Sequence, residues 1–180
     1  MNLPNKLTVG RLVAVPVIMV CMSLDNAAAR WAAFALFVLA CLTDFLDGKI
    51  ARSRGLVTNL GKFLDPLADK ALVCAVLTYF VQSGFAHPAA VIIVLLREFV
   101  VSGVRMAAVT QGRVVAANIF GKIKTAFQMV SMSAILFFAA LMPEAGWLVT
   151  FSNVCVWIIA ALTAASGVVY VVQNRDVFAE

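Results

Sequence analysis

Long apolar runs separated by short polar segments constrain this chain more than any other feature. Hydrophobic residues make up 63% of its 180 residues and charged residues 13%, and the mean hydropathy is +1.00. Apolar segments of about 20 residues with few charges are typical of membrane-spanning helices. The runs are continuous, which differs from the alternating pattern of a membrane barrel. The sequence therefore predicts an all-α integral membrane protein.

We expect six transmembrane helices that form one domain over residues 1–180, with a short surface segment at 1–6 and a polar tail at 173–180. The predicted spans are 7–24, 27–50, 65–82, 89–109, 125–142 and 147–172. The segments 51–64 and 110–124 are predicted to be polar, basic loops.

Basic residues gather on the side of the chain that holds both termini. The other side offers Arg30, together with the acidic residues Asp25 and Glu144. Because positively charged segments flanking membrane spans stay in the cytoplasm, the pattern predicts cytoplasmic termini and cytoplasmic loops at 51–64 and 110–124.

Acidic residues concentrate where the second and third apolar runs meet the polar segment between them. Four of the six aspartates lie here, at Asp44, Asp47, Asp65 and Asp69. Their spacings place each pair on one helix face, and antiparallel neighbouring helices would bring both pairs to one depth. A carboxylate set without Cys or His favours Mg²⁺ or Mn²⁺ over zinc. Two such ions suit an in-line displacement at phosphorus.

Small and basic residues accompany the aspartates. Gly48 stands where a side chain would crowd a ligand on the metals, and Ala51 is small on the same face. Arg52 lies one turn beyond Gly48, where its guanidinium can pair with a phosphate, and Gly61 precedes the second aspartate pair. Two alternatives stay open at this point. The aspartates would be structural caps or ion-pair partners, or they would line the path of a cation transporter.

Cations in the later spans predict a second anionic substrate. Arg97 and Arg105 are eight residues apart on a similar helix face, and Lys122 and Lys124 begin the next span on the same side. An arginine inside a span needs a cavity or a partner. A phosphate-bearing substrate would satisfy such a cluster, and Glu98 would orient one arginine by a salt bridge. A structural Arg97–Glu98 pair, or lipid phosphates on Arg105 and Lys124, are the alternatives.

The acidic segment contains the pattern D-x-x-D-G-x-x-A-R, eight residues, and then G-x-x-x-D-x-x-x-D. In every fixed position it resembles the CDP-alcohol phosphotransferases. The resemblance implies a six-helix membrane fold, a homodimer, two divalent cations on the pyrophosphate of a CDP-linked substrate, and release of CMP. By position, the four aspartates would hold the metals, and Asp69 would also be the general base. The CDP-lipid would contact Gly48, Ala51, Arg52 and Gly61, with Thr8 and Arg11 as further candidates that have a surface-anchor role as their alternative.

Residues 3–11, 97–99 with 103–105, and 121–125 are similar to the phosphatidylglycerophosphate synthase branch of that family. This implies transfer of a phosphatidyl group from CDP-diacylglycerol to sn-glycerol 3-phosphate, with Arg97, Arg105, Lys122 and Lys124 on the acceptor phosphate. The alternatives are a related synthase that uses serine or inositol phosphate, a divalent-cation transporter, and a lipid-binding scaffold. We expect a bacterial inner (cytoplasmic) membrane with the active site facing the cytoplasm, membrane lipids as partners, and no nucleic acid.

Overall fold

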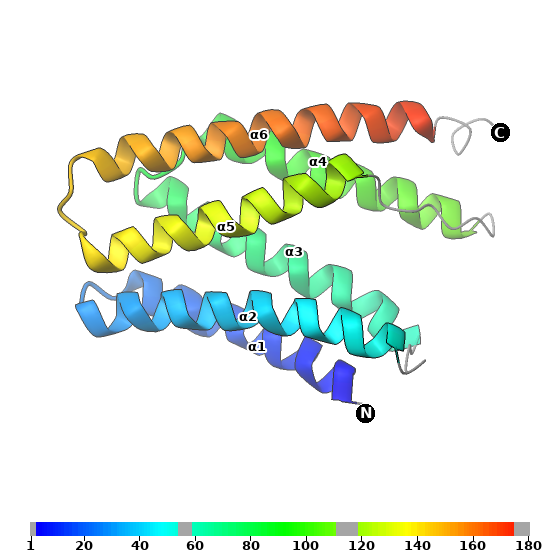
Figure 1. Cartoon of the computed structure of the whole chain (residues 1–180), viewed down its shortest axis with the longest axis horizontal. Coiled ribbons are helices and arrows are strands. Elements are labelled where there is room, and N and C mark those ends of the chain that lie inside the picture. The colour runs from blue at the N-terminus through cyan, green and yellow to red at the C-terminus, as the bar shows by residue number, and fades with distance from the viewer. Residues whose placement is uncertain (1–2, 54–58, 111–118, 175–180) are drawn as a thin grey trace.

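The computed structural model describes residues 3–53, 59–110 and 119–174, with side chains over 7–44, 67–108 and 121–174. In these ranges the backbone forms six helices: α1 (Leu3–Ser23), α2 (Ala27–Ser53), α3 (Asn59–Gln82), α4 (Pro88–Thr110), α5 (Ile119–Leu141) and α6 (Trp147–Gln173). The helices run along one long axis and alternate in direction (Figure 1). The predicted all-α architecture is thereby confirmed.

Both chain termini lie at one end of the bundle (Figure 1). At this end α2 and α4 end and α3 and α5 begin, and we call it the terminal end. Short turns close the opposite end. At one of them the Asn26 side-chain oxygen accepts a hydrogen bond from the Ala29 backbone N–H over 2.8 Å and caps the start of α2. At another, Gly84 has φ 74°, a conformation that glycine adopts without strain.

Four helix ends differ from the predicted spans by three residues or more. The first helix begins at Leu3, within the predicted surface segment 1–6. The second helix continues to Ser53, α3 begins at Asn59 and α5 begins at Ile119, so parts of the predicted loops 51–64 and 110–124 are helical. Hydropathy marks the apolar part of a helix, whereas Lys and Leu favour helix on either side of the membrane boundary. The two helices that carry the aspartates therefore extend past their apolar segments toward the terminal end.

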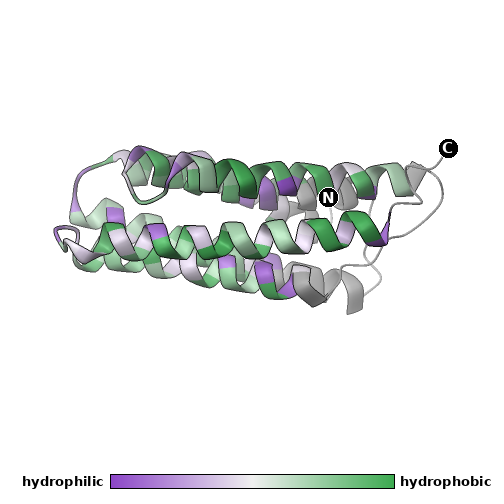
Figure 2. Cartoon of the chain, turned by 90° about the horizontal axis from the view of Figure 1, so that it is seen from above, coloured by the Kyte–Doolittle hydropathy of each residue, from purple (hydrophilic) through white to green (hydrophobic). Residues whose placement is uncertain are grey.

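Hydrophobic residues predominate along most of the length of the helices (Figure 2). Within the described residues, α2, α5 and α6 contain stretches long and apolar enough to cross a membrane, at 27–44, 121–141 and 147–173, and α1 adds a shorter apolar stretch at 7–23. Large apolar side chains such as Phe99 and Val130 are 60% and 68% exposed. A soluble surface rarely exposes so much apolar area, and the protein is an integral membrane protein.

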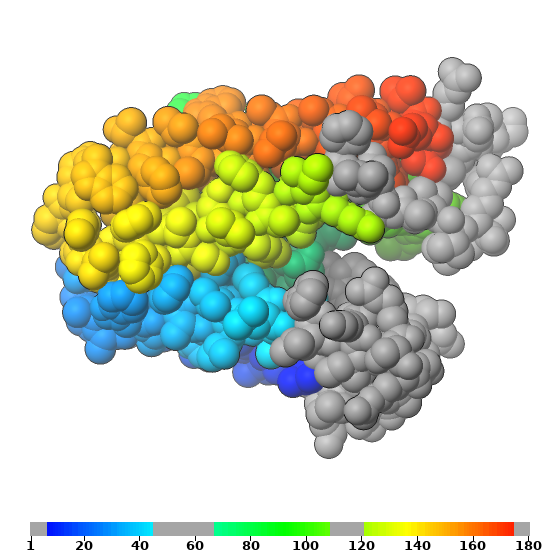
Figure 3. Space-filling model, viewed as in Figure 1, coloured from blue at the N-terminus to red at the C-terminus, as the bar shows by residue number. Residues whose placement is uncertain are grey.

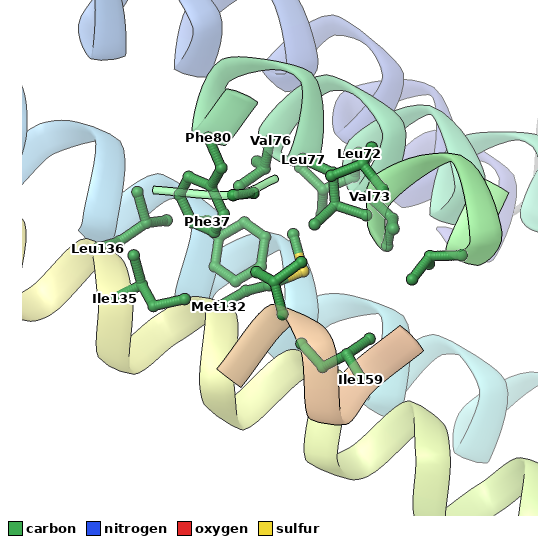
Figure 4. Packing of buried hydrophobic residues seen from close by; sticks show 14 of the residues in the cluster. Phe37, Leu72, Val73, Val76, Leu77, Phe80, Met132, Ile135, Leu136 and Ile159 are labelled. Atoms are coloured by element: carbon green, nitrogen blue, oxygen red, sulfur yellow. The ribbon is translucent and has the colours of Figure 1, made fainter. Parts of the chain in front are cut away.

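The buried core fills the half of the bundle away from the terminal end. Phe37 of α2, Phe80 of α3, Met132 of α5 and Ile159 of α6 pack together there (Figure 4). The first helix packs against both α2 and α3, while α2 packs on α5 and α6 packs on α4 and α5. Among the described residues, the close packing of α2 is thus with α1 and α5, where direct packing on α3 was expected.

Candidate functional site

Two adjoining cavities open near the terminal end, and Asp44 and Asp69 border both of them. Cavity A, of about 510 Å³, lies between α2 and α5 with α3 behind, and its lining includes Arg11, Cys41, Lys122 and Met129. Cavity B, of about 270 Å³, lies beside α4, and its lining includes Lys70, Arg97, Glu98 and Arg105. Thr125 of α5 also borders both cavities. Figure 3 shows the surface hollowed between α2 and α5, where cavity A opens.

Asp44 is held by a buried arginine from the first helix. The Arg11 Nη1 donates to the Asp44 Oδ1 over 2.6 Å, and the arginine side chain is only 1% exposed while that of Asp44 is 45% exposed. Thr8, one turn earlier, is fully buried. The surface-anchor alternative for these two residues is therefore wrong. Arg11 joins α1 to the acidic part of α2 at the rim of cavity A.

The described donor atoms around Asp44 and Asp69 fit a hard divalent cation. Two carboxylates face one space, and the nearby Cys41 Sγ is turned to the Met129 Sδ at 3.6 Å. Oxygen ligands of this kind suit Mg²⁺ or Mn²⁺. The part of the chain with described side chains contains no group of three acidic, Cys or His residues that could hold a metal. The other predicted metal and CDP-lipid residues, Asp47, Gly48, Ala51, Arg52, Gly61 and Asp65, have side chains outside the described residues.

The predicted acceptor cations divide between the two cavities. Arg97 and Arg105 both border cavity B, as expected for residues two turns apart. Lys122 borders cavity A, three residues before the shared Thr125. Lys124 is buried and pairs with Glu98. The predicted salt bridge of Glu98 to an arginine is confirmed, since the Arg97 Nη1 donates to the Glu98 Oε1 over 3.1 Å.

Three residues beside the arginines were not anticipated from the sequence. Lys70 directly follows Asp69 and borders cavity B, and its position beside the motif was the available signal. Gly167 of α6 lies against the Arg97 side chain. The Tyr170 hydroxyl accepts a hydrogen bond from the Arg105 Nε over 3.3 Å. A glycine and a tyrosine in an apolar helix gave no hint of which neighbours they would meet.

Comparison with known proteins agrees with the resemblance seen in the acidic segment. The family model for CDP-alcohol phosphatidyltransferase matches residues 1–170. A CDP-diacylglycerol–glycerol-3-phosphate 3-phosphatidyltransferase of Bacillus subtilis is 40% identical, over 97% of this chain and 96% of the relative. The protein of the same name from Rickettsia bellii is 38% identical, over 94% of this chain and 93% of its own. A probable phosphatidylglycerophosphate synthase of Mycobacterium tuberculosis is 36% identical, over 98% of this chain and 83% of its own. With a match of this extent, the chain belongs to the CDP-alcohol phosphatidyltransferase family.

Proposed function

We propose that this protein transfers the phosphatidyl group of CDP-diacylglycerol to sn-glycerol 3-phosphate and releases CMP. The observation that carries the proposal is the position of Asp44 and Asp69 on the rim shared by two cavities of different character. A reaction between a lipid-linked nucleotide and a small anion needs two adjoining binding spaces with reactive carboxylates between them. The names of the similar proteins from B. subtilis and R. bellii support the same reaction.

Cavity A is the space that suits the lipid-linked substrate. It is the larger of the two, and Ala40, Leu72 and Ala126 contribute apolar surface to its lining. Its opening between α2 and α5 lies on a side of the bundle (Figure 3), where acyl chains would continue into the bilayer. In this proposal Arg11 and Asp44 lie beside the headgroup, together with the CDP-lipid residues expected from the motif: Thr8, Gly48, Ala51, Arg52 and Gly61.

Cavity B is the space that suits the acceptor. Arg97, Arg105 and Lys70 border it, and three cations around a small cavity match the phosphate of glycerol 3-phosphate. Arginine is well suited to such a phosphate because its fork of N–H donors binds two oxygens at once. We place Lys122 and Lys124 on the same phosphate from α5, whose Thr125 borders both cavities.

In the proposed reaction, Asp69 accepts the proton of the acceptor's primary hydroxyl. The hydroxyl oxygen then forms a bond to the lipid-linked phosphorus of CDP-diacylglycerol, the bond from that phosphorus to the CMP oxygen breaks, and CMP leaves with the electron pair. Two Mg²⁺ or Mn²⁺ ions, held by Asp44, Asp47, Asp65 and Asp69, would supply charge stabilisation for the pyrophosphate. The fixed cations of cavity B orient the acceptor, and positioning of this kind supplies much of the rate of such reactions.

The setting of the site is part of the proposal. We propose that both cavities face the cytoplasm at a bacterial inner membrane, and the basic residues of the terminal end support this orientation. The six helices act as one domain over residues 1–180, and two copies form a homodimer. The membrane orientation, the single domain and the homodimer do not change which residues contact the substrates in this proposal.

CMP release from purified protein tests the proposal. With CDP-diacylglycerol and Mg²⁺, we expect CMP with glycerol 3-phosphate and none with serine or inositol phosphate. Preference for another acceptor would leave the phosphatidyl transfer reaction standing but would overturn the assignment of glycerol 3-phosphate as the acceptor. Flux of Mn²⁺ into vesicles without CMP release would favour a transporter instead. A chelator should stop CMP release, and either Mg²⁺ or Mn²⁺ should restore it.

The variant Lys122→Ala tests the acceptor assignment separately. Because its ammonium is placed on the acceptor phosphate, its loss should raise the KM for glycerol 3-phosphate far more than the KM for CDP-diacylglycerol. Equal changes in both constants would contradict the assignment of Lys122.

A further inference from the structure

We propose that α6 positions the two arginines of cavity B. In this proposal Gly167 leaves room for the Arg97 side chain, and Tyr170 holds the Arg105 side chain in place. The inference rests on the proposed function, since it concerns the site that we assign to the acceptor phosphate. Among the described residues that border cavities A and B, none belongs to α6. The last helix would therefore act on the substrate only through the arginines of α4, against which it packs.

Gly167 provides the space in which the Arg97 side chain lies. A Cβ atom at position 167 would stand 2.7 Å from the Arg97 Cγ, 3.7 Å from its Nε and 3.8 Å from its Cβ. Separations under 3.0 Å are essentially never seen for real Cβ atoms. The Cγ is near the backbone of Arg97, so bending the flexible end of the side chain cannot relieve the contact.

Arg97 has little freedom to move elsewhere. Its side chain is 13% exposed, and its Nη1 donates to the Glu98 Oε1. Any side chain at position 167 must therefore turn Arg97 about its first torsion or push α6 away from α4. Either change moves the guanidinium away from its present place at cavity B.

Tyr170 provides a second support one helical turn farther along α6. Residues three apart lie on the same helix face, so Gly167 and Tyr170 face α4 together. The Tyr170 hydroxyl accepts a hydrogen bond from the Arg105 Nε over 3.3 Å, and the Arg105 Cζ lies 5.7 Å from the centre of the tyrosine ring. A cation over an aromatic face is attracted to it.

The tyrosine itself is held firmly. Its side chain is buried and packs with Val101 and Val104 of α4. Because the Tyr170 ring is buried and packed whereas Arg105 is exposed, the position of the ring determines the position of the arginine side chain. The contact between Tyr170 and Arg105 thus sets the direction of the Arg105 side chain, and Gly167 sets the position of the Arg97 side chain. One face of α6 thereby fixes the distance between the two guanidinium groups.

The test compares Gly167→Ala with Gly103→Ala. Both positions are helical glycines, but a Cβ at Gly103 meets nothing within 4 Å. Both variants gain the same helix propensity from alanine, and only one creates the collision with Arg97. We expect Gly167→Ala to raise the KM for glycerol 3-phosphate by roughly tenfold or more, as misplaced binding groups do. The KM for CDP-diacylglycerol should stay near that of wild type, and Gly103→Ala should change neither constant.

A second variant decides the matter if Gly167→Ala does not fold. Tyr170→Phe keeps the ring and its packing but removes the oxygen that accepts from Arg105. The KM for glycerol 3-phosphate should rise by about threefold to tenfold, the change expected for one lost hydrogen bond, again without a matching change for CDP-diacylglycerol.

The possible outcomes separate this inference from the proposed function. Wild-type protein that releases no CMP with glycerol 3-phosphate would overturn the proposed function and the inference together. Wild-type turnover, with Gly167→Ala equal to Gly103→Ala or with both KM values raised equally, would overturn the inference alone. An acceptor-specific rise in the Gly167 variant, or in Tyr170→Phe where the first does not fold, supports it.

Discussion

The Arg11 guanidinium donates to the Asp44 carboxylate over 2.6 Å and joins α1 to the acidic part of α2. The arginine is enclosed by the protein, whereas Asp44 keeps nearly half of its side-chain surface open toward the cavities. One partner of the pair is therefore structural, and the other remains available to a ligand.

This asymmetry predicts a large stability effect at Arg11. Arg11→Gln leaves Asp44 without its cation and places an amide in a space shaped for a guanidinium. Loss of one partner of a buried pair costs about 3–5 kcal/mol, and since Asp44 is half-open we expect the lower part of that range. Thermal unfolding in detergent measures the effect as a lower melting temperature.

The matched control is Arg30→Gln at the opposite end of the bundle. Arg30 bonds Asp25 over 2.8 Å, but the Asp25 side chain is 97% exposed. Exposed pairs of this kind contribute about 0–1 kcal/mol, so this variant should unfold close to wild type. Equal losses in the two variants would refute a special structural role for Arg11.

Asp69 is predicted to act on the proton of the acceptor. Asp69→Asn keeps the shape of the side chain but cannot accept that proton, so kcat for CMP release should fall by about 10²–10⁴, the usual contribution of a general base. The melting temperature should stay near that of wild type. Asp25→Asn, a change of the same kind at an exposed carboxylate far from the cavities, should leave kcat unaltered. Retained turnover in Asp69→Asn would remove this residue as the base.

Lys70 borders cavity B, and its charge faces the proposed acceptor space. Lys70→Gln should raise the KM for glycerol 3-phosphate by roughly tenfold, the loss expected when one charge-assisted hydrogen bond of about 1.5 kcal/mol or more is removed. The KM for CDP-diacylglycerol, measured in the same preparation, serves as the control. A change confined to the lipid substrate would assign Lys70 to cavity A instead.

The sequence predicted the helices well because each apolar run is long and each turn is short. It misplaced the start of α3, at Asn59 instead of residue 65, because hydropathy reports depth in the membrane and says nothing of where backbone hydrogen bonds stop. The position of Asp44 and Asp69 on one shared rim follows from the alternating direction of the helices.

Other parts of the site depend on tertiary contacts that no local pattern encodes. Arg11 sits 33 residues from its partner Asp44, and Tyr170 sits 65 residues from Arg105. Helix spacing shows which residues share a face but leaves open which helix that face will meet. The packing of α6 against α4 could be known only once the bundle was assembled.

Glu98 bonds both Arg97 and Lys124, and all three side chains are less than one-fifth exposed. Glu98→Gln would strand two cations in a poorly solvated space, and breaking such a pair costs about 3–5 kcal/mol. The double variant Glu98→Gln with Lys124→Met removes one stranded cation and should recover part of the lost melting temperature. Glu144→Gln, in the exposed turn at the opposite end, should unfold like wild type. If the double variant is no more stable than Glu98→Gln, the buried Lys124 ammonium carries no free-energy penalty when it is left without its partner. That result would show that the Glu98–Lys124 pair does not stabilise the fold.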